Sequence, residues 1–200
     1  MTTPSSHQRF HSICVFCGSA DGLEPRFLQA ASSMGALLAR RKIQLVFGGG
    51  KTGMMGAVAD GALHMGGTVI GIVPENLNLP SLIHSDLTRL EITPDMHTRK
   101  AQMSALADAF IALPGGFGTL EELFETLTWA QIGLHQKSIG ILNTDSYYNP
   151  LLEMVNQAIR HGFIYSEHRA LLIDAPTPEL LLEKMERFVS PVNLERWVNR

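Results

Sequence analysis

The chain has 200 residues, of which 45% are hydrophobic, enough for one domain with a sizeable core. A net charge of −3 and a pI near 6.2 exclude the basic field that collects nucleic acid or an anionic membrane surface. Residues 1–11 lack the apolar segment of a signal peptide, and no apolar run reaches the roughly 20 residues of a membrane span. We therefore expect a cytoplasmic protein that binds neither nucleic acid nor membranes.

Short apolar runs alternate with amphipathic stretches, which is typical of a parallel sheet with helices on both faces. The runs predict strands near 12–17, 43–47, 68–73, 109–113, 138–143 and 171–174. The amphipathic stretches predict helices near 24–41, 52–65, 96–107, 120–132, 147–161 and 177–188. We expect an α/β fold, a single-domain Rossmann-like parallel sheet flanked by helices on both faces, over residues 12–189, with tails at 1–11 and 190–200. The longest irregular segment, 74–88, has a length that functional lids and rims often have.

The two cysteines, Cys14 and Cys17, form a C-x-x-C, a spacing found in redox and zinc sites. In a strand, however, positions three apart face opposite sides, and no second cysteine or histidine pair has zinc-site spacing. The sequence also lacks H-E-x-x-H and G-x-S-x-G motifs, and no lysine is singled out for a Schiff base. We interpret both cysteines as buried and inert, and expect neither a metal nor a cofactor.

The stretch from Pro114 to Glu122, P-G-G-F-G-T-L-E-E, is the most informative part of the sequence. It follows the apolar run 109–113 and opens a helical pattern. A glycine-rich turn between strand and helix aims free N–H groups at a ligand, and the helix dipole adds positive potential there. The expected guest is a phosphate group, and the carboxylates that follow suggest chemistry on the bound molecule.

Two further turns, Gly18–Ser19 and Gly48–Gly50, are expected at the same edge, beyond the carboxyl ends of the strands. The second turn precedes Lys51 but is not a P-loop, because Leu45 occupies the position of the first required glycine. The first turn lacks the G-x-G-x-x-G pattern of dinucleotide sites. Alternatively, the glycines around residue 50 serve only close packing of helix on sheet.

Thr119 and Glu122 also have the spacing of a helix capping box, in which each side chain would bond to an amide of the first turn. A structural cap and a ligand-facing position both remain open for them. Glu121 and Glu122 diverge by about 100° on a helix, so only one of them faces a given site. Glu125 follows Glu122 by one turn and is a candidate second carboxylate on that face.

Arg99 and Lys100 lie near the start of a predicted helix, where positive charge opposes the helix dipole. A bound anion would compensate this mismatch; ordinary solvated surface charge is the alternative. We interpret His97 as structural. The apolar positions from Trp129 to Leu134 indicate a core or a subunit interface.

With Met96-His97-x-Arg99-Lys100 joined to Pro114-Gly-Gly-x-Gly-Thr-x-x-Glu122, the chain closely resembles the Lonely Guy family. Members are cytokinin riboside 5′-monophosphate phosphoribohydrolases, often labelled lysine decarboxylases. The resemblance runs from Ile13 to about Leu182. It implies a Rossmann-like homodimer, an N-glycosidase that cleaves the N-glycosidic bond of a cytokinin riboside 5′-monophosphate (N6-modified AMP, or AMP itself) to the free base and ribose 5-phosphate.

The resemblance also implies residue roles. Arg99 and Glu122 match the catalytic pair: the carboxylate would stabilise an oxocarbenium-like state, while the guanidinium would clamp the nucleotide and keep Glu122 ionised. The positions implied to bind substrate are Gly18, Ser19, Gly49, Gly50, Met96, Lys100, Pro114, Gly115, Gly116, Gly118 and Thr119. Many relatives carry an acidic residue in the loop after the third strand, where this chain reads Pro80–His84, so base or ribose contacts are not carried over to that loop.

Two other functions compete with hydrolysis. The first is a carrier that binds a nucleotide or a pterin cofactor on the same scaffold without turnover. Such a carrier does not need Arg99 together with Glu122. The second is a lysine decarboxylase, which would show the absorbance band of pyridoxal phosphate.

Overall fold

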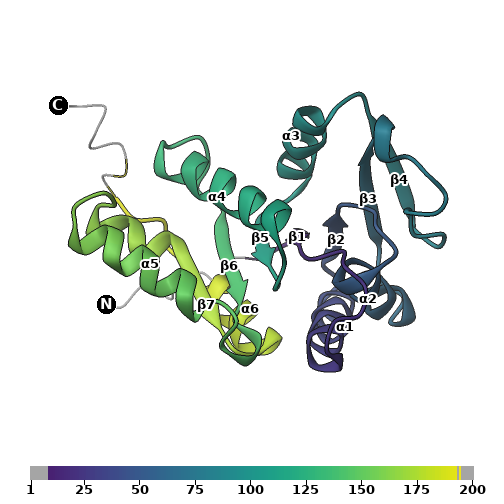
Figure 1. Cartoon of the computed structure of the whole chain (residues 1–200), viewed down its shortest axis with the longest axis horizontal. Helices are drawn as coiled ribbons and strands as arrows, with labels where there is room; N and C mark the ends of the chain where they lie inside the picture. Colours follow the sequence, from purple (N-terminus) through teal and green to yellow (C-terminus); the bar gives the residue numbers. More distant parts are fainter. Residues whose placement is uncertain (1–8, 193, 195–200) are drawn as a thin grey trace.

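The computed structural model describes residues 9–192 and residue 194, and every structural statement below concerns these residues. One parallel sheet lies between two layers of helices (Figure 1). Its strands are β1 (Ser12–Phe16), β2 (Gln44–Phe47), β3 (Val69–Pro74), β4 (Arg89–Thr93), β5 (Ala109–Ala112), β6 (Ser138–Leu142) and β7 (Leu172–Ala175). The α helices are α1 (Pro25–Arg40), α2 (Gly53–His64), α3 (Met96–Leu106), α4 (Phe117–Gln131), α5 (Asn149–Arg160) and α6 (Pro178–Glu186).

The sheet order is β4-β3-β2-β1-β5-β6-β7, and all neighbouring strands are parallel. The predicted α/β class is confirmed, as are the six predicted strands and six predicted helices. The strand order reverses between β1 and β5, so the loops after these two strands diverge to opposite faces and leave a crevice. The loops after β1 and β5 contain the first and third predicted turns.

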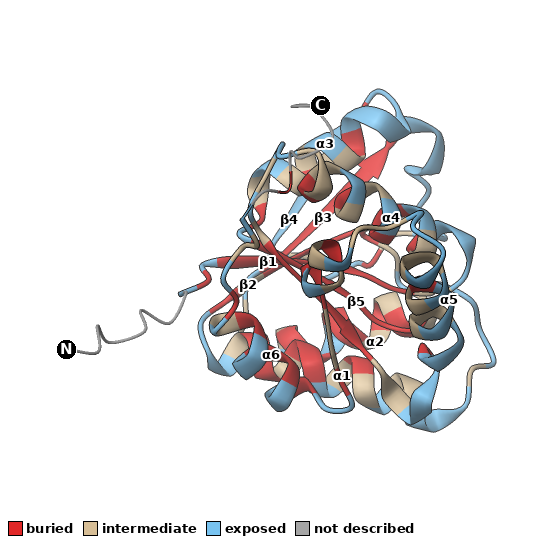
Figure 2. Ribbon diagram, turned by 90° about the vertical axis from the view of Figure 1, so that its left-hand side faces the viewer, coloured by how far each residue is buried: buried red, intermediate tan, exposed pale blue. Residues whose placement is uncertain are grey.

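Two hydrophobic cores fill the space on either side of the sheet, and Figure 2 shows the strands buried between helices whose outer faces are exposed. One core packs α1, α2 and α6 against the sheet, and the other packs α3, α4 and α5. Cys14 belongs to the second core and Cys17 to the first, so the two thiols lie on opposite faces. Both are free and buried, as predicted, and burial raises the pKa of each thiol.

The strand β4 was not predicted. It is an edge strand that pairs only with β3, and its side chains Leu90 and Ile92 are 41% and 42% exposed. Because the backbone ladder rather than burial stabilises it, the sequence shows no clear apolar run. The preceding irregular segment folds back on the second glycine turn: Ile83 forms an antiparallel bridge with Gly50.

No helix in the described part of the chain is both long and apolar enough to cross a membrane.

Candidate active site

The three predicted turns meet at the carboxyl edge of the sheet, where Gly18 connects them. Its N–H donates to Pro114 O at 3.1 Å, and its carbonyl accepts from the N–H groups of Met54 and Met55. Ser19 O accepts from the hydroxyl of Thr52 at 2.7 Å. The loops after β1, β2 and β5 are therefore one hydrogen-bonded unit, built almost entirely from backbone groups.

Helix α4 begins at Phe117, three residues earlier than predicted, and its N-cap is Gly116, which has no side-chain cap. The capping-box interpretation of Thr119 and Glu122 is therefore wrong, since both lie inside the helix. Among the described residues, no protein acceptor takes the amides of residues 117–119. In α2, by contrast, Gly18 O takes two of the first amides. Of these two helix starts, α4 is the one that presents free amides to an anion.

These amides face a cavity of about 320 Å³, a size that suits a small ligand. Its lining residues are Cys17, Gly18, Ser19, Ala20, Met55, Arg99, Gly116, Phe117, Gly118, Thr119 and Glu122. Seven residues that the sequence predicted for the site are among them: Gly18, Ser19, Arg99, Gly116, Gly118, Thr119 and Glu122. The structure thus brings both predicted catalytic residues to the wall of the cavity that holds the free amides.

The other predicted site residues do not line this cavity. Gly49 and Gly50 contact the 74–88 segment instead, where Gly49 O accepts from the N–H of His84 at 2.9 Å. Pro114 and Gly115 line a neighbouring, mainly apolar cavity of about 210 Å³. In the described structure the glycines and Pro114 contribute backbone hydrogen bonds and lie outside the cavity that Arg99 and Glu122 line.

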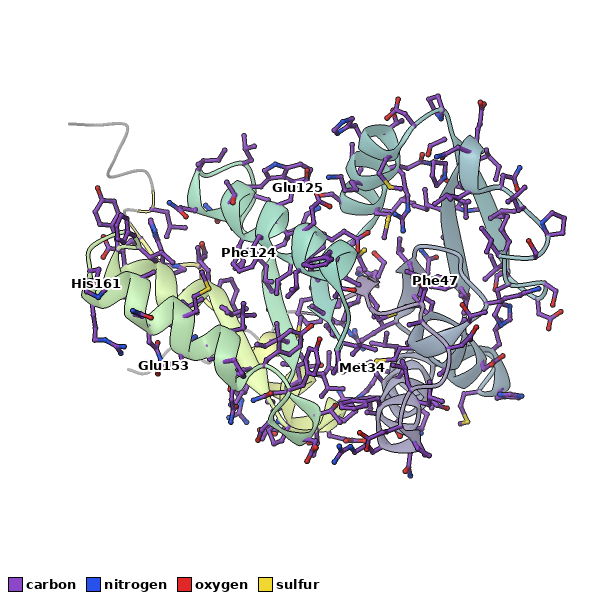
Figure 3. All side chains as sticks on the ribbon, in the orientation of Figure 1. Met34, Phe47, Phe124, Glu125, Glu153 and His161 are labelled. Carbon is purple, nitrogen blue, oxygen red and sulfur yellow. The ribbon has the colours of Figure 1, made fainter. Side chains whose placement is uncertain are left out.

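Met96 and Lys100 lie beside the cavity. The Met96 sulfur accepts from Nη1 of Arg99 at 3.0 Å. The ammonium of Lys100 pairs with Glu121 and Glu125 at 2.5 and 2.9 Å, and these contacts raise its pKa despite the opposing effect of burial. Figure 3 shows Glu125 on α4. Lys100 thus joins α3 to α4 through these ion pairs, and its positive charge acts on Glu122 without direct contact. Glu125 is an ion-pair partner of Lys100.

Arg99 and Glu122 form the charged centre of the site. Both are buried, and Nη1 of Arg99 lies 3.5 Å from Oε1 of Glu122. Nε of Arg99 donates to Ile72 O at 3.0 Å, which fixes the guanidinium against the end of β3. Asp95 caps α3 by accepting from the N–H of Thr98 at 2.8 Å, so the arginine enters from the first turn of that helix. At 3.5 Å the carboxylate is held by charge more than by a direct hydrogen bond, and it keeps acceptor capacity for a ligand.

The pKa of Glu122 is raised to about 7. Burial is the main cause; the Arg99 guanidinium lowers the pKa, Glu121 raises it and Lys100 lowers it. Arg99 favours the ionised form of this carboxyl, as expected, but the loss of hydration outweighs the attraction of the guanidinium, so the pKa stays above its ordinary value. A carboxyl that titrates near neutral pH is suited to exchanging a proton or stabilising a nearby cation.

Several residues of the site were missed in the sequence. Gly48 abuts the Arg99 guanidinium so closely that a Cβ at this position would overlap Nη2. Met55 and Cys17 line the cavity, and Phe117 at its mouth is 93% exposed. The glycine run marked Gly48 as part of a turn, but its contact with an arginine some fifty positions away depends on the tertiary fold. The apolar lining residues were missed because they resemble core residues in a sequence.

Replacing Gly48 by alanine is expected to lower kcat/KM about 10- to 100-fold, because a displacement of about 1 Å of a group that acts on the substrate can cost this much, and the sequence predicts Arg99 as such a group. The new methyl group would push the guanidinium away from Ile72 O and Glu122. The measurement is kcat/KM for the nucleoside 5′-monophosphate that the family resemblance implies as substrate, together with the thermal midpoint. In an Arg99→Met background the same alanine should cost little more. A full additional loss in the double variant would contradict this explanation.

Comparison with solved structures shows the same fold. The molybdenum cofactor binding protein of Rippkaea orientalis has a TM-score of 0.67 at 24% identity, covering 88% of this chain and 94% of that one. The molybdenum cofactor carrier protein of Chlamydomonas reinhardtii has a TM-score of 0.66 at 22% identity, covering 88% and 96% of the two chains. At these identities the likeness concerns the fold alone.

Sequence comparison identifies the family. A family described as "Possible lysine decarboxylase" matches residues 55–185. Two cytokinin riboside 5′-monophosphate phosphoribohydrolases of Arabidopsis thaliana, LOG3 and LOG7, are 47% and 45% identical to this chain over 181 and 180 residues. The alignments cover 90% of this chain, 84% of LOG3 and 83% of LOG7. The chain therefore belongs to the family of the cytokinin riboside 5′-monophosphate phosphoribohydrolases.

Proposed function

We propose that this protein hydrolyses the N-glycosidic bond of cytokinin riboside 5′-monophosphates, with AMP as a second candidate substrate, to give the free base and ribose 5-phosphate. One observation carries the proposal beyond the family membership. The buried pair Arg99 and Glu122 lines the same cavity as the unpaired amides that open α4. The free amides of residues 117–119 can bind a phosphate, and one helical turn later Glu122 supplies a carboxyl whose pKa is about 7. This arrangement suits a phosphorylated sugar whose reacting carbon lies beside Glu122.

The arrangement supports the reaction as follows. The 5′-phosphate would accept from the amides of residues 117–119, and this binding energy would position the ribose. As the C1′–N bond breaks, positive charge develops on the sugar, which the Glu122 carboxylate would stabilise while it orients the attacking water. The water oxygen bonds to C1′, and the proton that the water loses would pass by way of Glu122 and solvent to the nitrogen of the departing base. Arg99 would hold this carboxylate in place and contact the nucleotide through its remaining N–H groups. The substrate-binding and catalytic roles of these residues are part of the proposal.

The pH dependence of the rate should follow Glu122. Because the ionised form is the active one, kcat/KM for a substrate is expected to fall as the pH drops below about 7. Glu121 raises the pKa of Glu122, and Lys100 lowers it. Glu121→Gln should therefore move the midpoint to lower pH, and Lys100→Met should move it to higher pH. Rate profiles of the three proteins, with buffers of constant ionic strength, measure the shifts.

The substrate phosphate itself titrates near pH 6, so a midpoint that is identical in all three proteins would point to the phosphate instead of Glu122.

Parallel incubation with isopentenyladenosine monophosphate and AMP tests the function, with free base and ribose 5-phosphate followed by chromatography. Release of both products from the prenylated nucleotide would support the proposal and rank the two substrates. The dephosphorylated riboside should be a much poorer substrate. Equal turnover of riboside and monophosphate would contradict phosphate binding by the amides of residues 117–119.

Tight binding of a nucleotide without cleavage would instead favour the carrier function. A carrier gains nothing from placing Glu122 and Arg99 together in the binding cavity, and this is the observation against it. Lysine decarboxylation has less support, because none of the described residues that line the cavity is a lysine able to form a Schiff base. A pyridoxal absorbance band in the purified protein would reverse that judgement.

We also propose a homodimer that pairs through α4 and the turn that follows it. Phe117, Phe124 and Leu134 are 93%, 41% and 68% exposed, and Phe124 lies on α4 (Figure 3). Exposed apolar side chains along one helix and the turn after it favour a subunit contact. Light scattering that gives a monomer at micromolar concentration would contradict the dimer.

The cytoplasm is the proposed location, because two free buried thiols, Cys14 and Cys17, suit a reducing compartment.

A further inference from the structure

Tyr147 lies outside the family motifs, yet it contacts the loop that leads into α4. Its hydroxyl donates to Gly115 O at 2.7 Å. We infer that Tyr147 is a positioning residue for phosphate recognition: it holds the peptide between Gly115 and Gly116 in the orientation that presents the Gly116 amide to the substrate. This inference rests on the proposed function, because it adds the Gly116 amide to the phosphate site formed by the amides of residues 117–119.

The geometry of the peptide unit carries the first step. In a planar trans peptide the C=O of one residue and the N–H of the next point in opposite directions. Gly115 O points to Tyr147, which lines the apolar cavity of about 210 Å³ and does not line the larger one. The N–H of Gly116 therefore points away from Tyr147. No acceptor for this amide exists among the described residues, and Gly116 itself borders both cavities.

Hydrogen bonds to carbonyl groups fix the whole loop from Leu113 to Gly115. Three consecutive carbonyls are each bonded: Leu113 O accepts from the hydroxyl of Tyr148 at 2.6 Å, Pro114 O from the N–H of Gly18, and Gly115 O from Tyr147. Glycine backbones otherwise sample many conformations. The bonded carbonyls of Pro114 and Gly115 keep the amides that follow them aimed before the ligand arrives, which lowers the entropic cost of binding an anion. Leu113 O is followed by Pro114, which has no amide.

Tyr147 is itself held firmly. It follows a tight 3-10 turn, Thr144–Ser146, in which Asp145 and Ser146 have φ values of 51° and 61°. Such left-handed conformations are unfavourable for these residues and persist only where surrounding contacts impose them. The carboxylate of Asp145 pairs with Arg26 of α1, and the ring of Tyr147 meets Phe27 edge-on with centroids 6.0 Å apart. These contacts place the hydroxyl at a defined point on the loop.

The two adjacent tyrosines offer a matched pair of variants. Tyr147→Phe frees Gly115 O and so releases a peptide that carries the Gly116 amide. Tyr148→Phe frees Leu113 O, but the following residue is Pro114, whose nitrogen carries no hydrogen and cannot serve an anion. Tyr148 is buried whereas Tyr147 is 43% exposed, so loss of the Tyr148 hydroxyl should cost more stability.

The test compares wild type, Tyr147→Phe and Tyr148→Phe in three measurements: kcat and KM for isopentenyladenosine monophosphate, calorimetric affinity for ribose 5-phosphate, and the thermal midpoint. For Tyr147→Phe we expect KM and the Kd for ribose 5-phosphate to rise about fivefold to tenfold, the effect of one net hydrogen bond, with kcat and the midpoint nearly unchanged. For Tyr148→Phe we expect the midpoint to fall while the Kd stays near that of the wild type.

Turnover of the dephosphorylated riboside should be the same in Tyr147→Phe and wild type. An unchanged Kd in Tyr147→Phe, or an equal rise in both variants, would overturn the inference. If the wild type binds ribose 5-phosphate without cleaving any nucleotide, the proposed reaction fails, and the calorimetric comparison still decides the role of Tyr147.

Discussion

Replacing Glu122 by glutamine is expected to lower kcat about 10²- to 10⁴-fold, the range that removal of a catalytic acid–base or charge-stabilising group gives. Glutamine keeps the shape of the side chain but cannot carry the negative charge that opposes the charge on the sugar. Nucleotide binding should persist, because the amides that open α4 and the Arg99 guanidinium are untouched. Single-turnover rates and calorimetric affinity for AMP measure the two effects separately. Full activity in the folded variant would exclude the carboxylate mechanism.

The same variant should be more stable than the wild type at alkaline pH. The pKa of Glu122 is raised from 4.5 to about 7 on folding, so the folded state holds this proton more tightly than the unfolded state. That contribution to the free energy of unfolding is fully present below about pH 4.5 and is lost as the pH rises through about 7. The Glu122→Gln variant keeps this contribution at every pH, because glutamine does not ionise. We expect the two thermal midpoints to coincide near pH 4.5 and to separate by several degrees at pH 8.5, corresponding to at most about 3 kcal/mol.

Glu121→Gln is the matched control for this stability effect. Glu121 is the preceding residue on α4, but its side chain is 56% exposed. Its removal should not reproduce the separation. An equal gain in the Glu121 variant would show that net charge, and not the burial of Glu122, governs the alkaline stability.

Local patterns predicted most of the fold. Buried strands such as β1 and β6 are continuous apolar runs between turn residues, and both lie within one residue of the predicted bounds. β4 was missed because an edge strand needs no buried face. The start of α4 was predicted too late, because Thr119 suggested a capping box. The observed N-cap is Gly116, which has no side chain that could mark the helix start in the sequence.

The site was predictable where chemistry is local. Free amides at a glycine-rich helix start and a carboxylate one turn later can be recognised from the order of residues alone. Features that depend on tertiary distance could not be predicted. They are the burial that raises the pKa of Glu122, the ion pairs of Lys100 with Glu121 and Glu125, and the hydrogen bond from the Tyr147 hydroxyl to Gly115 O. Each joins elements that are separated along the chain, and no spacing in the sequence measures them.

Replacing Arg99 by methionine is expected to lower kcat/KM at pH 7 by about 10²-fold or more, a loss comparable to that of one transition-state donor. The guanidinium lowers the pKa of Glu122, so its removal should raise that pKa further and leave the carboxyl mostly protonated at neutral pH. Part of the lost activity should therefore return as the pH is raised to about 9. Rates from pH 6 to 9.5 measure this recovery.

Arg99→Lys separates charge from shape. An ammonium keeps the positive charge, but its N–H groups share one nitrogen, whereas the arginine uses Nε for Ile72 O and Nη1 for Met96 and Glu122. We expect Arg99→Lys to keep the midpoint of the pH–rate profile closer to that of the wild type than Arg99→Met does, while kcat/KM remains reduced at every pH because the nucleotide clamp is lost. A parallel loss in both variants with an unshifted midpoint would mean that Arg99 acts on the nucleotide alone. The electrostatic coupling to Glu122, visible as the 3.5 Å contact, would then play no part in the rate.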